Sequence, residues 1–328
     1  MTAVARTRDD LATVREEWRR EGSTVAVVMT MGALHAGHAE LIHRAKERSD
    51  RVVVTDFLNP LQFAPGEDLD KYPRTFAADL ELCRAENVDL LFAPGPAEVY
   101  ASGDPLVTVH AGVIGDVLEG RSRPGHFDGV LTVVAKLLNL TAADIAYFGQ
   151  KDAQQLWLIS RMVRDLDFAV EVVEVPTVRD DDGLALSSRN TYLGPQDRGH
   201  ALALYEGLQL GVQAARTGAD SALTAARAHL EAAGIQIDYV ALVDPTSFQP
   251  FKGEGEAILL VAAFVGTTRL IDNVRLAVGD VPVSREGDHT CCSRLTSVTR
   301  KRYLVCSTAT LSTTPGGSRR MTHGPLMS

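Results

Sequence analysis

Short apolar runs rich in β-branched residues alternate with amphipathic helical stretches between residues 25 and 175. Between these runs, residues such as Leu41, Ile42 and Ala45 recur at the spacing of one helix face. Continuous apolar strands that alternate with helices favour a parallel sheet covered on both faces, the doubly wound α/β architecture. Sheets of this kind bind ligands at the carboxyl ends of their strands. The predicted strands are Val25–Met29, Arg51–Phe57, Asp89–Ala93, Ile145–Phe148 and Glu171–Val175.

The pattern changes after about residue 176. Two helical stretches, Gln196–Arg216 and Ala219–Ala233, are followed by apolar runs that are typical of strands. We therefore expect one domain over residues 1–176 and a smaller α+β domain over residues 177–283. The strands predicted for the second domain are Gln236–Val243, Ala257–Val265 and Arg269–Leu276.

Residues 284–328 have no apolar periodicity, and 15 of these 45 residues are Ser or Thr. Such a composition buries too little apolar surface to offset the entropy of ordering, so a disordered tail is predicted. Seven basic and two acidic residues give this tail a net charge of +5. Because the whole chain has a net charge of −9, residues 1–283 have a net charge of −14. A body this acidic repels polyphosphate backbones, so no nucleic acid partner is expected.

Apolar run lengths and cysteine usage indicate a cytoplasmic protein. The longest apolar run, Ala257–Val265, has nine residues, whereas a membrane span needs about 20. The first residues lack the apolar core of a signal peptide, so no membrane association is expected. The four cysteines form neither a disulfide framework nor a CxxC pair, which fits a reducing compartment.

The first predicted strand runs directly into TMGALHAGH (residues 30–38), which contains an HxGH element, and the apolar spacing of a helix resumes at Ala39. His35 and His38 are three residues apart at the start of a helix, so their side chains share one face. Gly32 and Gly37 would leave room for a ligand, and the helix N-terminus would supply free amides and partial positive charge. Imidazoles placed there can donate hydrogen bonds to phosphate oxygens in a transition state. No metal site is expected, because zinc needs further ligands and the sequence has no HExxH motif or Cys cluster.

HxGH after a first strand is shared by class I aminoacyl-tRNA synthetases and many nucleotidyltransferases, so alone it indicates only a superfamily. Further motifs narrow the assignment. They are NPLQF (59–63), EDLDKYPRT (67–75), RPGHF (123–127), FGQKDAQQ (148–155) and DGLALSSRN (182–190). In this order and spacing, over about residues 1–283, the chain resembles the pantothenate synthetase (pantoate–β-alanine ligase) family.

The resemblance implies a Rossmann-like nucleotidyltransferase fold in which residues 1–176 bind ATP and pantoate and residues 177–283 form a lid. It implies an ATP-dependent condensation of pantoate with β-alanine through a pantoyl adenylate, with release of pyrophosphate and AMP. Magnesium is expected because ATP is the substrate, and a homodimer is implied.

The same resemblance assigns roles by motif position, with His38 as proton donor and His35 and Lys151 as further catalytic residues. Asp152 would contact the ribose, Lys151 the phosphates and Val178 the adenine. Gln62 and Gln155 would hold pantoate, and Gln62 would also neighbour β-alanine. The implied ATP-site residues are Met31, Gly32, Ala33, Leu34, His35, Ala36, Gly37, His38, Gly149, Gln150, Lys151, Asp152, Val178, Leu186, Ser187, Ser188 and Arg189.

The residue chemistry agrees with this assignment independently. A carboxylate that attacks an α-phosphate needs positive donors around the phosphates and neutral donors around the acid, since a full cation on the nucleophile would weaken it. Lys151, Arg189, His35 and His38 suit the first task. Asn59, Gln62 and Gln155 suit the second, so Asn59 is added to the pantoate site.

Each motif also has a structural interpretation. Lys151 and Asp152 could form a local ion pair, Gln62 could be a turn residue, and Ser187 and Ser188 could cap a helix. His126 lies in a motif but has no role that the sequence reveals.

Three residues depart from the family pattern. Met29 stands where the family has proline, which loosens the turn after the strand. Ala36 replaces the acid common between the two histidines, without apparent cost. Asp56 stands where the family has an apolar residue in a buried strand, and an unpaired buried carboxylate costs several kcal/mol.

Two other functions remain open. Another HxGH nucleotidyltransferase could act on a phosphorylated acceptor, but such an acceptor would favour Arg and Lys over Gln62 and Gln155. A catalytically silent adenylate-binding protein could retain the pocket, which AMP production would test. A tRNA synthetase would need a tRNA-binding domain and a basic face, and the acidic body supplies neither.

Overall fold

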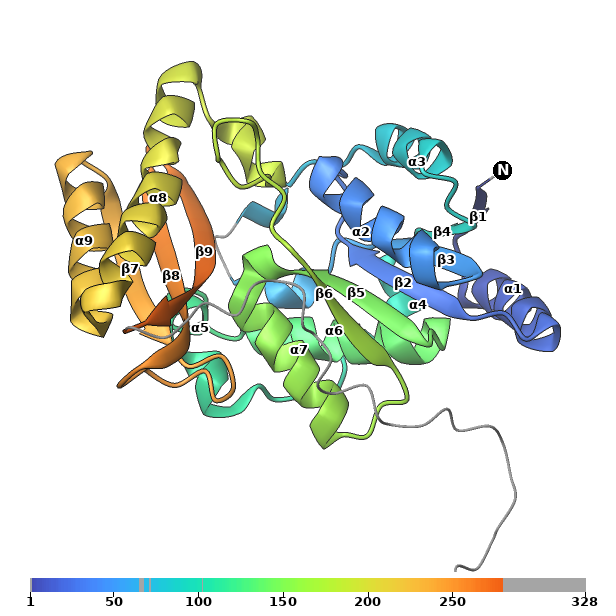
Figure 1. Ribbon diagram of the computed structural model, residues 1–328. Helices are drawn as coiled ribbons and strands as arrows, with labels where there is room; N and C mark the ends of the chain where they lie inside the picture. The colour runs from blue at the N-terminus through green and yellow to red at the C-terminus, as the bar shows by residue number, and fades with distance from the viewer. Residues whose placement is uncertain (1, 65–67, 71, 102, 280–328) are drawn as a thin grey trace, which may run out of the picture. The chain divides into compact units, whose positions relative to one another are not determined.

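The computed structural model describes residues 2–64, 68–70, 72–101 and 103–279, and its first part is a six-stranded parallel sheet (Figure 1). The strand order is β1-β4-β3-β2-β5-β6. The strands are β1 (Ala3–Ala5), β2 (Val25–Thr30), β3 (Arg51–Asp56), β4 (Leu90–Phe92), β5 (Ile145–Gly149) and β6 (Glu171–Val175). The doubly wound α/β fold is confirmed, and the five strands expected from the apolar runs are present to within one residue at each end.

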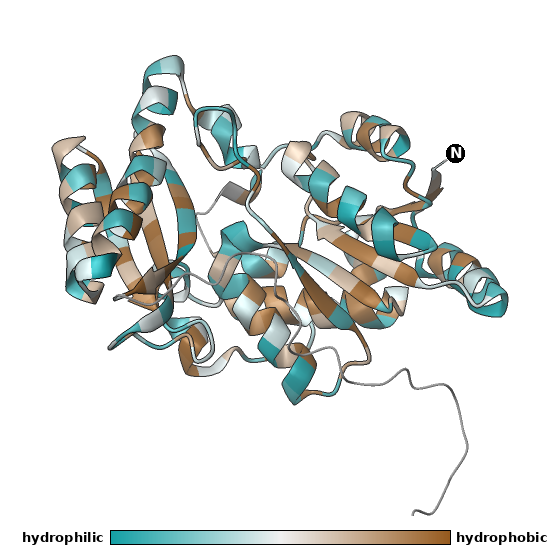
Figure 2. Ribbon diagram, in the orientation of Figure 1, coloured by the Kyte–Doolittle hydropathy of each residue, from teal (hydrophilic) through white to brown (hydrophobic). Residues whose placement is uncertain are grey.

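Helices cover both faces of this sheet. Successive strand residues point to opposite faces, so Val27 packs in one apolar cluster with α1, α6 and α7, while Val28 packs in a second with α2 and α3. Figure 2 shows β2, β3 and β5 as brown along most of their length, whereas α2 and α7 alternate between teal and brown. The helices of this part are α1 (Arg8–Glu21), α2 (Ala36–Arg48), α3 (Phe76–Ala85), α4 (Pro96–Val99), α5 (Glu119–Ser122), α6 (His126–Thr141) and α7 (Ala153–Asp165).

The second part is the expected smaller α+β unit. An antiparallel sheet of β7 (Gln236–Val243), β8 (Gly255–Val265) and β9 (Thr268–Val278) packs against α8 (Pro195–Ala214) and α9 (Ala219–Ala232). Gly211 allows the close approach of α8 to this sheet, because a Cβ there would lie 2.4 Å from the Leu259 side chain.

The two parts share apolar contacts. Tyr239 and Leu260 of the small sheet belong to the same buried cluster as Phe148 of β5 and Leu156 of α7. The boundary at residue 176 stays a prediction, and the predicted disordered tail (284–328) lies outside the described residues. Within the described part of the chain, no helix has the length and apolarity needed to cross a bilayer.

Candidate active site

The candidate site lies at the point of the large sheet where the strand order reverses, with β3 and β4 on one side of β2 and β5 and β6 on the other. β2 pairs with β3 on one side and with β5 on the other, with Val28 opposite Tyr147. The chain leaves the carboxyl ends of these neighbouring strands in opposite directions, which opens the crevice that doubly wound sheets use for ligands. The HxGH segment follows β2, and the segment Gly149–Asp152 follows β5. The fold therefore brings together two motifs that are more than 100 residues apart.

The two histidines of the HxGH element form a hydrogen-bonded pair with their rings tilted toward each other at 45°. His35 is the N-cap of α2, and its Nδ1 accepts a hydrogen bond from the main-chain N–H of Gly37 at 3.1 Å. The main-chain N–H of His35 donates to Nδ1 of His38 at 3.2 Å, and the ring centroids lie 4.1 Å apart. Because both Nδ1 atoms accept, each neutral ring carries its proton on Nε2.

This geometry corrects two expectations about the start of α2. The helix begins at Ala36, three residues earlier than the apolar spacing indicated, because His35 caps it. The amide of Gly37, expected to be free for phosphate, is taken by the ring of His35. The side-chain donors that this segment offers to a phosphate are the imidazole Nε2–H groups.

Burial keeps both histidines neutral. It lowers the pKa of His38 to about 3, with a smaller contribution from the neighbouring His35. Burial also lowers the pKa of His35, and the positive charge of Lys151 lowers it further. The expectation that His35 and His38 act as positive donors is therefore wrong; at neutral pH they are hydrogen-bond donors without charge, and the positive charge must come from lysine and arginine.

The loop between β2 and α2 is held by Asp79, a fully buried residue of α3. Its carboxylate accepts hydrogen bonds from the main-chain N–H groups of Ala33 at 3.1 Å and Leu34 at 2.7 Å. Gly32 makes the turn with φ of +81°. Because their amides face Asp79, Ala33 and Leu34 do not line the candidate site.

Asp56, the residue that departs from the family pattern, lies at the end of β3 against this loop. A Cβ on Gly32 would come within 2.6 Å of Asp56 Oδ1. Among the described residues, none donates a hydrogen bond to the Asp56 carboxylate. Burial raises the pKa of Asp56 to about 6, and the charge of Asp79 raises it further, while Arg6 acts in the opposite direction. The carboxylate is thus partly buried and poorly compensated, as expected.

Two cavities of about 240 and 560 Å³ adjoin at the carboxyl ends of β2 and β5. We call them the smaller and the larger cavity. The smaller is lined by both histidines and by apolar side chains of α6 such as Val130 and Val133. The larger extends to β9. The residues that line both are Arg123, His126, Lys151, Asp152, Gln155, Ser187 and Arg189.

Neutral amides line the smaller cavity. Gln62 is buried; its Oε1 accepts a hydrogen bond from Asn59 Nδ2 at 3.0 Å, and its Nε2 lies 2.9 Å from the sulfur of Met31. Gln155 makes no side-chain hydrogen bond with the other described residues. The Asn59 side chain is fully engaged, because it also donates to Gly129 O and accepts from Tyr100 and Leu61. Gln155 can thus bind a ligand directly, whereas Asn59 orients Gln62.

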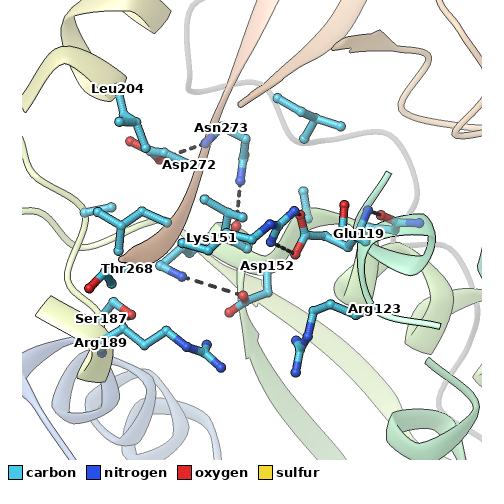
Figure 3. A pocket seen from close by; sticks show the side chains of 18 of the residues that line it. Glu119, Arg123, Lys151, Asp152, Ser187, Arg189, Leu204, Thr268, Asp272 and Asn273 are labelled. Carbon is cyan, nitrogen blue, oxygen red and sulfur yellow. Dashed lines mark hydrogen bonds and ion pairs between the residues drawn. The ribbon is translucent and has the colours of Figure 1, made fainter. Parts of the chain in front are cut away.

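Cationic side chains gather where the two cavities meet. Lys151 Nζ lies 3.6 Å from Asp152 Oδ1, so the local ion pair is present. Figure 3 shows Arg189 and Arg123 on either side of Asp152 in that view. Ser187 also has the structural role considered above, because its Oγ accepts from the Arg189 N–H and caps a short helical turn. Ser188 Oγ lies 3.2 Å from the hydroxyl of Tyr72.

Most of the predicted site residues meet at the smaller cavity. Five do not line it: Ala33 and Leu34 turn toward Asp79, Gly32 lies against Asp56, Ala36 is exposed, and Gln150 lies at a separate pocket near Trp157. The fifteen that line it are Met31, His35, Gly37, His38, Asn59, Gln62, Gly149, Lys151, Asp152, Gln155, Val178, Leu186, Ser187, Ser188 and Arg189.

Sequence reasoning missed the role of Arg123 and His126. His126 Nδ1 lies 2.8 Å from Gln62 O, so it donates there, and Nε2 accepts from Arg123 Nη1 at 3.0 Å. His126 therefore fixes both the main chain of Gln62 and the guanidinium of Arg123. The RPGHF motif was visible in the sequence, but its helical i,i+3 spacing gave no indication that it faces Gln62, which is 64 residues away.

Comparison with known proteins gives one consistent family. A family model described as pantoate-beta-alanine ligase matches residues 3–275. Pantothenate synthetase from Salinispora arenicola is 53% identical over 278 residues, covering 84% of this chain and 97% of that protein. The crystal structure of pantothenate synthetase from Thermus thermophilus is 45% identical, covers 83% of this chain and 99% of that one, and has a TM-score of 0.78. A pantoate-beta-alanine ligase structure from Francisella tularensis, complexed with beta-gamma ATP and beta-alanine, is 33% identical, covers 84% of this chain and 97% of that one, and has a TM-score of 0.72.

Proposed function

The chain belongs to the pantoate-beta-alanine ligase family, and we propose on this basis that it condenses pantoate with β-alanine at the expense of ATP. The products are pantothenate, AMP and pyrophosphate, and the intermediate is pantoyl adenylate. The observation that carries this proposal is the division of donors at the site. The neutral amide of Gln62 lines the smaller cavity alone, whereas Gln155 lies with the cations Lys151, Arg189 and Arg123 where it meets the larger one.

This division suits the first half-reaction. A carboxylate oxygen of pantoate forms a bond to the α-phosphorus of ATP, and the bond from that phosphorus to the bridging oxygen breaks, so that pyrophosphate leaves with the electron pair. Lys151 and Arg189 stabilise the charge that develops on the phosphates. Gln62 and Gln155 orient the nucleophile without neutralising it, which preserves its reactivity. The Nε2–H groups of His35 and His38 donate to phosphate oxygens.

The second half-reaction needs no further cation. The ammonium group of β-alanine loses one proton to water, and the resulting amine attacks the acyl carbon. As the amide bond forms, the nitrogen loses a second proton to water, and the bond from that carbon to the AMP oxygen breaks so that AMP leaves with the electron pair. In our proposal, the main chain of Gln62 lies beside the acyl carbon of the adenylate. His126 holds this main chain through its hydrogen bond to Gln62 O. The neutral amides of Gln62 and Gln155 argue against a phosphorylated acceptor, which would call for bidentate arginine or lysine contacts.

Magnesium is proposed to enter with ATP. Among the described residues, no group of three or more His, Cys, Asp or Glu side chains is placed to hold a metal ion. Magnesium is commonly held by substrate phosphates and water with few protein ligands, so this donor set fits it. When bound, the ion would neutralise phosphate charge beside Lys151 and Arg189. We also propose a cytoplasmic location, where ATP is supplied.

A homodimer is proposed as the assembly. Three aliphatic side chains that are close in sequence support it, because they are exposed to an unusual degree: Leu106 is 102% exposed, Val107 87% and Val113 75%. We propose that they contribute to an interaction surface, and the family resemblance makes a second copy its occupant. Leu106→Asp should convert the dimer to a monomer in sedimentation, while the exposed Leu166→Asp should leave it dimeric.

The decisive test of the activity is a product assay with ATP, pantoate and β-alanine. We expect pantothenate and AMP in equal amounts. A purified chain that binds ATP but forms no AMP would be a silent adenylate-binding protein instead.

A further inference from the structure

Two adjacent residues of β9, Asp272 and Asn273, are anchored to different segments of the candidate site. Both are buried, with exposures of 4% and 7%. Neighbouring residues of a strand point to opposite faces. Asp272 and Asn273 can therefore reach two different parts of the chain, and the structure shows that each does so.

Asn273 holds the segment that carries Lys151. Its Nδ2 donates hydrogen bonds to the main-chain carbonyls of Gln150 at 2.9 Å and Lys151 at 2.8 Å. Both N–H bonds of the Asn273 side-chain amide therefore donate to consecutive peptide groups of the turn after β5. Figure 3 shows this contact between Asn273 and the segment of Lys151. The main chain from which the Lys151 side chain extends is therefore fixed from β9.

Asp272 holds the segment that carries Ser187 and Arg189. Its carboxylate pairs with both terminal nitrogens of Arg179, at 2.6 and 2.9 Å. Arg179 also donates to Gly183 O at 3.0 Å, and its guanidinium lies 4.8 Å from the centroid of the Tyr205 ring. A bidentate pair of this kind fixes both distance and orientation.

Arg179 is part of a hairpin that leads directly to the site. Arg179 and Ala185 form an isolated antiparallel bridge, and the Leu186 N–H donates to Val178 O at 3.0 Å. The residues that leave this hairpin are Ser187, Ser188 and Arg189. Asp272 therefore holds the hairpin at its base, shortly before the chain reaches Ser187, Ser188 and Arg189.

The two anchors are joined through β9 itself. The main-chain N–H of Asn273 donates to Asp272 Oδ1 at 2.7 Å, and Arg179 Nη2 donates to Asn273 O at 3.3 Å. We infer that Asp272 and Asn273 are positioning residues that set the spacing between Lys151 and the Ser187–Arg189 segment. The inference rests on the proposed function, because these two segments are those assigned to ATP.

The expected effect is on turnover rather than on binding of the acceptor. Misplacement of a catalytic group by about 1 Å can cost on the order of 10²-fold in rate. Asn273→Ala should lower the kcat of pantoate-dependent exchange of pyrophosphate into ATP by about 10- to 100-fold and leave the KM for β-alanine unchanged in the complete reaction. Arg179→Lys, which keeps the charge but loses the planar fork, should lower kcat in the same way.

The control is another contact of β9 with the large sheet. Arg275 pairs with Glu174 of β6 at 2.8 Å, and both side chains are about half exposed. Glu174→Gln breaks this pair without touching either ATP segment, so it should leave the exchange rate unchanged. A loss in this control equal to that in Asn273→Ala would mean that any contact between the two sheets matters, and would overturn the inference.

Amide hydrogen exchange in the full chain gives a readout that does not depend on activity. Asn273→Ala should speed exchange at the start of α7, and Arg179→Lys should speed it in residues 180–189. If wild-type protein forms no pantothenate, the proposed function fails while this measurement still tests the anchors. If wild-type protein is active and either variant, folded, shows the wild-type kcat, the inference fails alone. If Asn273→Ala does not fold, the kcat and the amide exchange of Arg179→Lys test the inference instead.

Discussion

The main-chain N–H of His35 donates to Nδ1 of His38 across 3.2 Å, and this contact sets the tautomer of the His38 ring. It assigns the proton of neutral His38 to Nε2, so this ring presents a donor toward the smaller cavity. The contact also places two imidazoles with their centroids 4.1 Å apart, where protonation of one opposes protonation of the other.

Removal of either imidazole should slow the reaction and preserve the fold. His35→Ala and His38→Ala should each lower turnover by roughly 10²- to 10³-fold, the scale for loss of one oriented donor to a transition state. His38→Gln, which can place an amide N–H near the position of Nε2, should lose less. His43→Ala is the matched control, since His43 lies on the same helix but is 69% exposed and faces Glu86. Wild-type rates in folded His38→Ala would remove this donor from the mechanism.

Neutral histidines make a specific prediction for stability in acid. The pKa of His38 is about 3 in the fold and near its ordinary 6.5 in the unfolded chain. Below about pH 6.5 the unfolded chain binds the additional proton, so the free energy of unfolding should fall as pH decreases, by at most about 1.4 kcal/mol per unit. Urea denaturation across this range should show a smaller slope in His38→Gln. An equal slope would mean that His38 is already charged in the fold.

Asp56 should have the opposite pH dependence. Its pKa is raised from 3.8 to about 6, so the ionised carboxylate destabilises the fold above that pH, and the cost disappears as Asp56 is protonated. Asp56→Val and Asp56→Asn should therefore raise the free energy of unfolding by on the order of 1 kcal/mol or more at neutral pH. The gain of Asp56→Asn should shrink toward pH 4. Destabilisation at neutral pH would show that the carboxylate has a favourable partner.

The order of the two half-reactions can be tested without β-alanine. Lys151 and Arg189 can stabilise the departing pyrophosphate without the amine, so ATP, pantoate and magnesium should suffice for exchange of labelled pyrophosphate into ATP. Lys151→Ala should abolish this exchange, and Gln155→Ala should weaken it strongly. Exchange that requires β-alanine would exclude an independent first step, and ADP as product would indicate an acyl phosphate and overturn the assignment.

The sequence was sufficient for those parts of the fold that local patterns determine. Apolar runs located β2, β3, β4 and β5 because buried parallel strands need continuous apolar residues. β6 was also located, but it is an edge strand in which only Val175 is buried. β1 was missed, since Ala3–Ala5 is too short to give a period and is stabilised by pairing with β4, with Ala3 opposite Leu90. The start of α2 was misplaced, because a histidine N-cap is outside the usual set of capping residues.

The site was predictable in its motifs but not in its supporting contacts. The motifs and the family resemblance that they carry pointed to His38, Gln62 and Lys151, and the three line one cavity in the structure. Nothing near Asp79 in the sequence indicates that it binds the amides of Ala33 and Leu34. Nothing near Asn273 indicates that it binds the carbonyl of Lys151. Such partners are brought together only by the tertiary fold, so a single sequence contains no local signal for them.

The pairing of β2 with β5 has a consequence for how the chain acquires its activity during synthesis. Val25 at the start of β2 and Asp144 just before β5 are bound to each other although 119 residues separate them. Closing a loop of that length is entropically costly and makes this pairing slow compared with local contacts. The HxGH segment therefore emerges from the ribosome long before the strand that completes its crevice. A nascent chain that ends before β5 should be unable to bind ATP, whatever helices it has already formed.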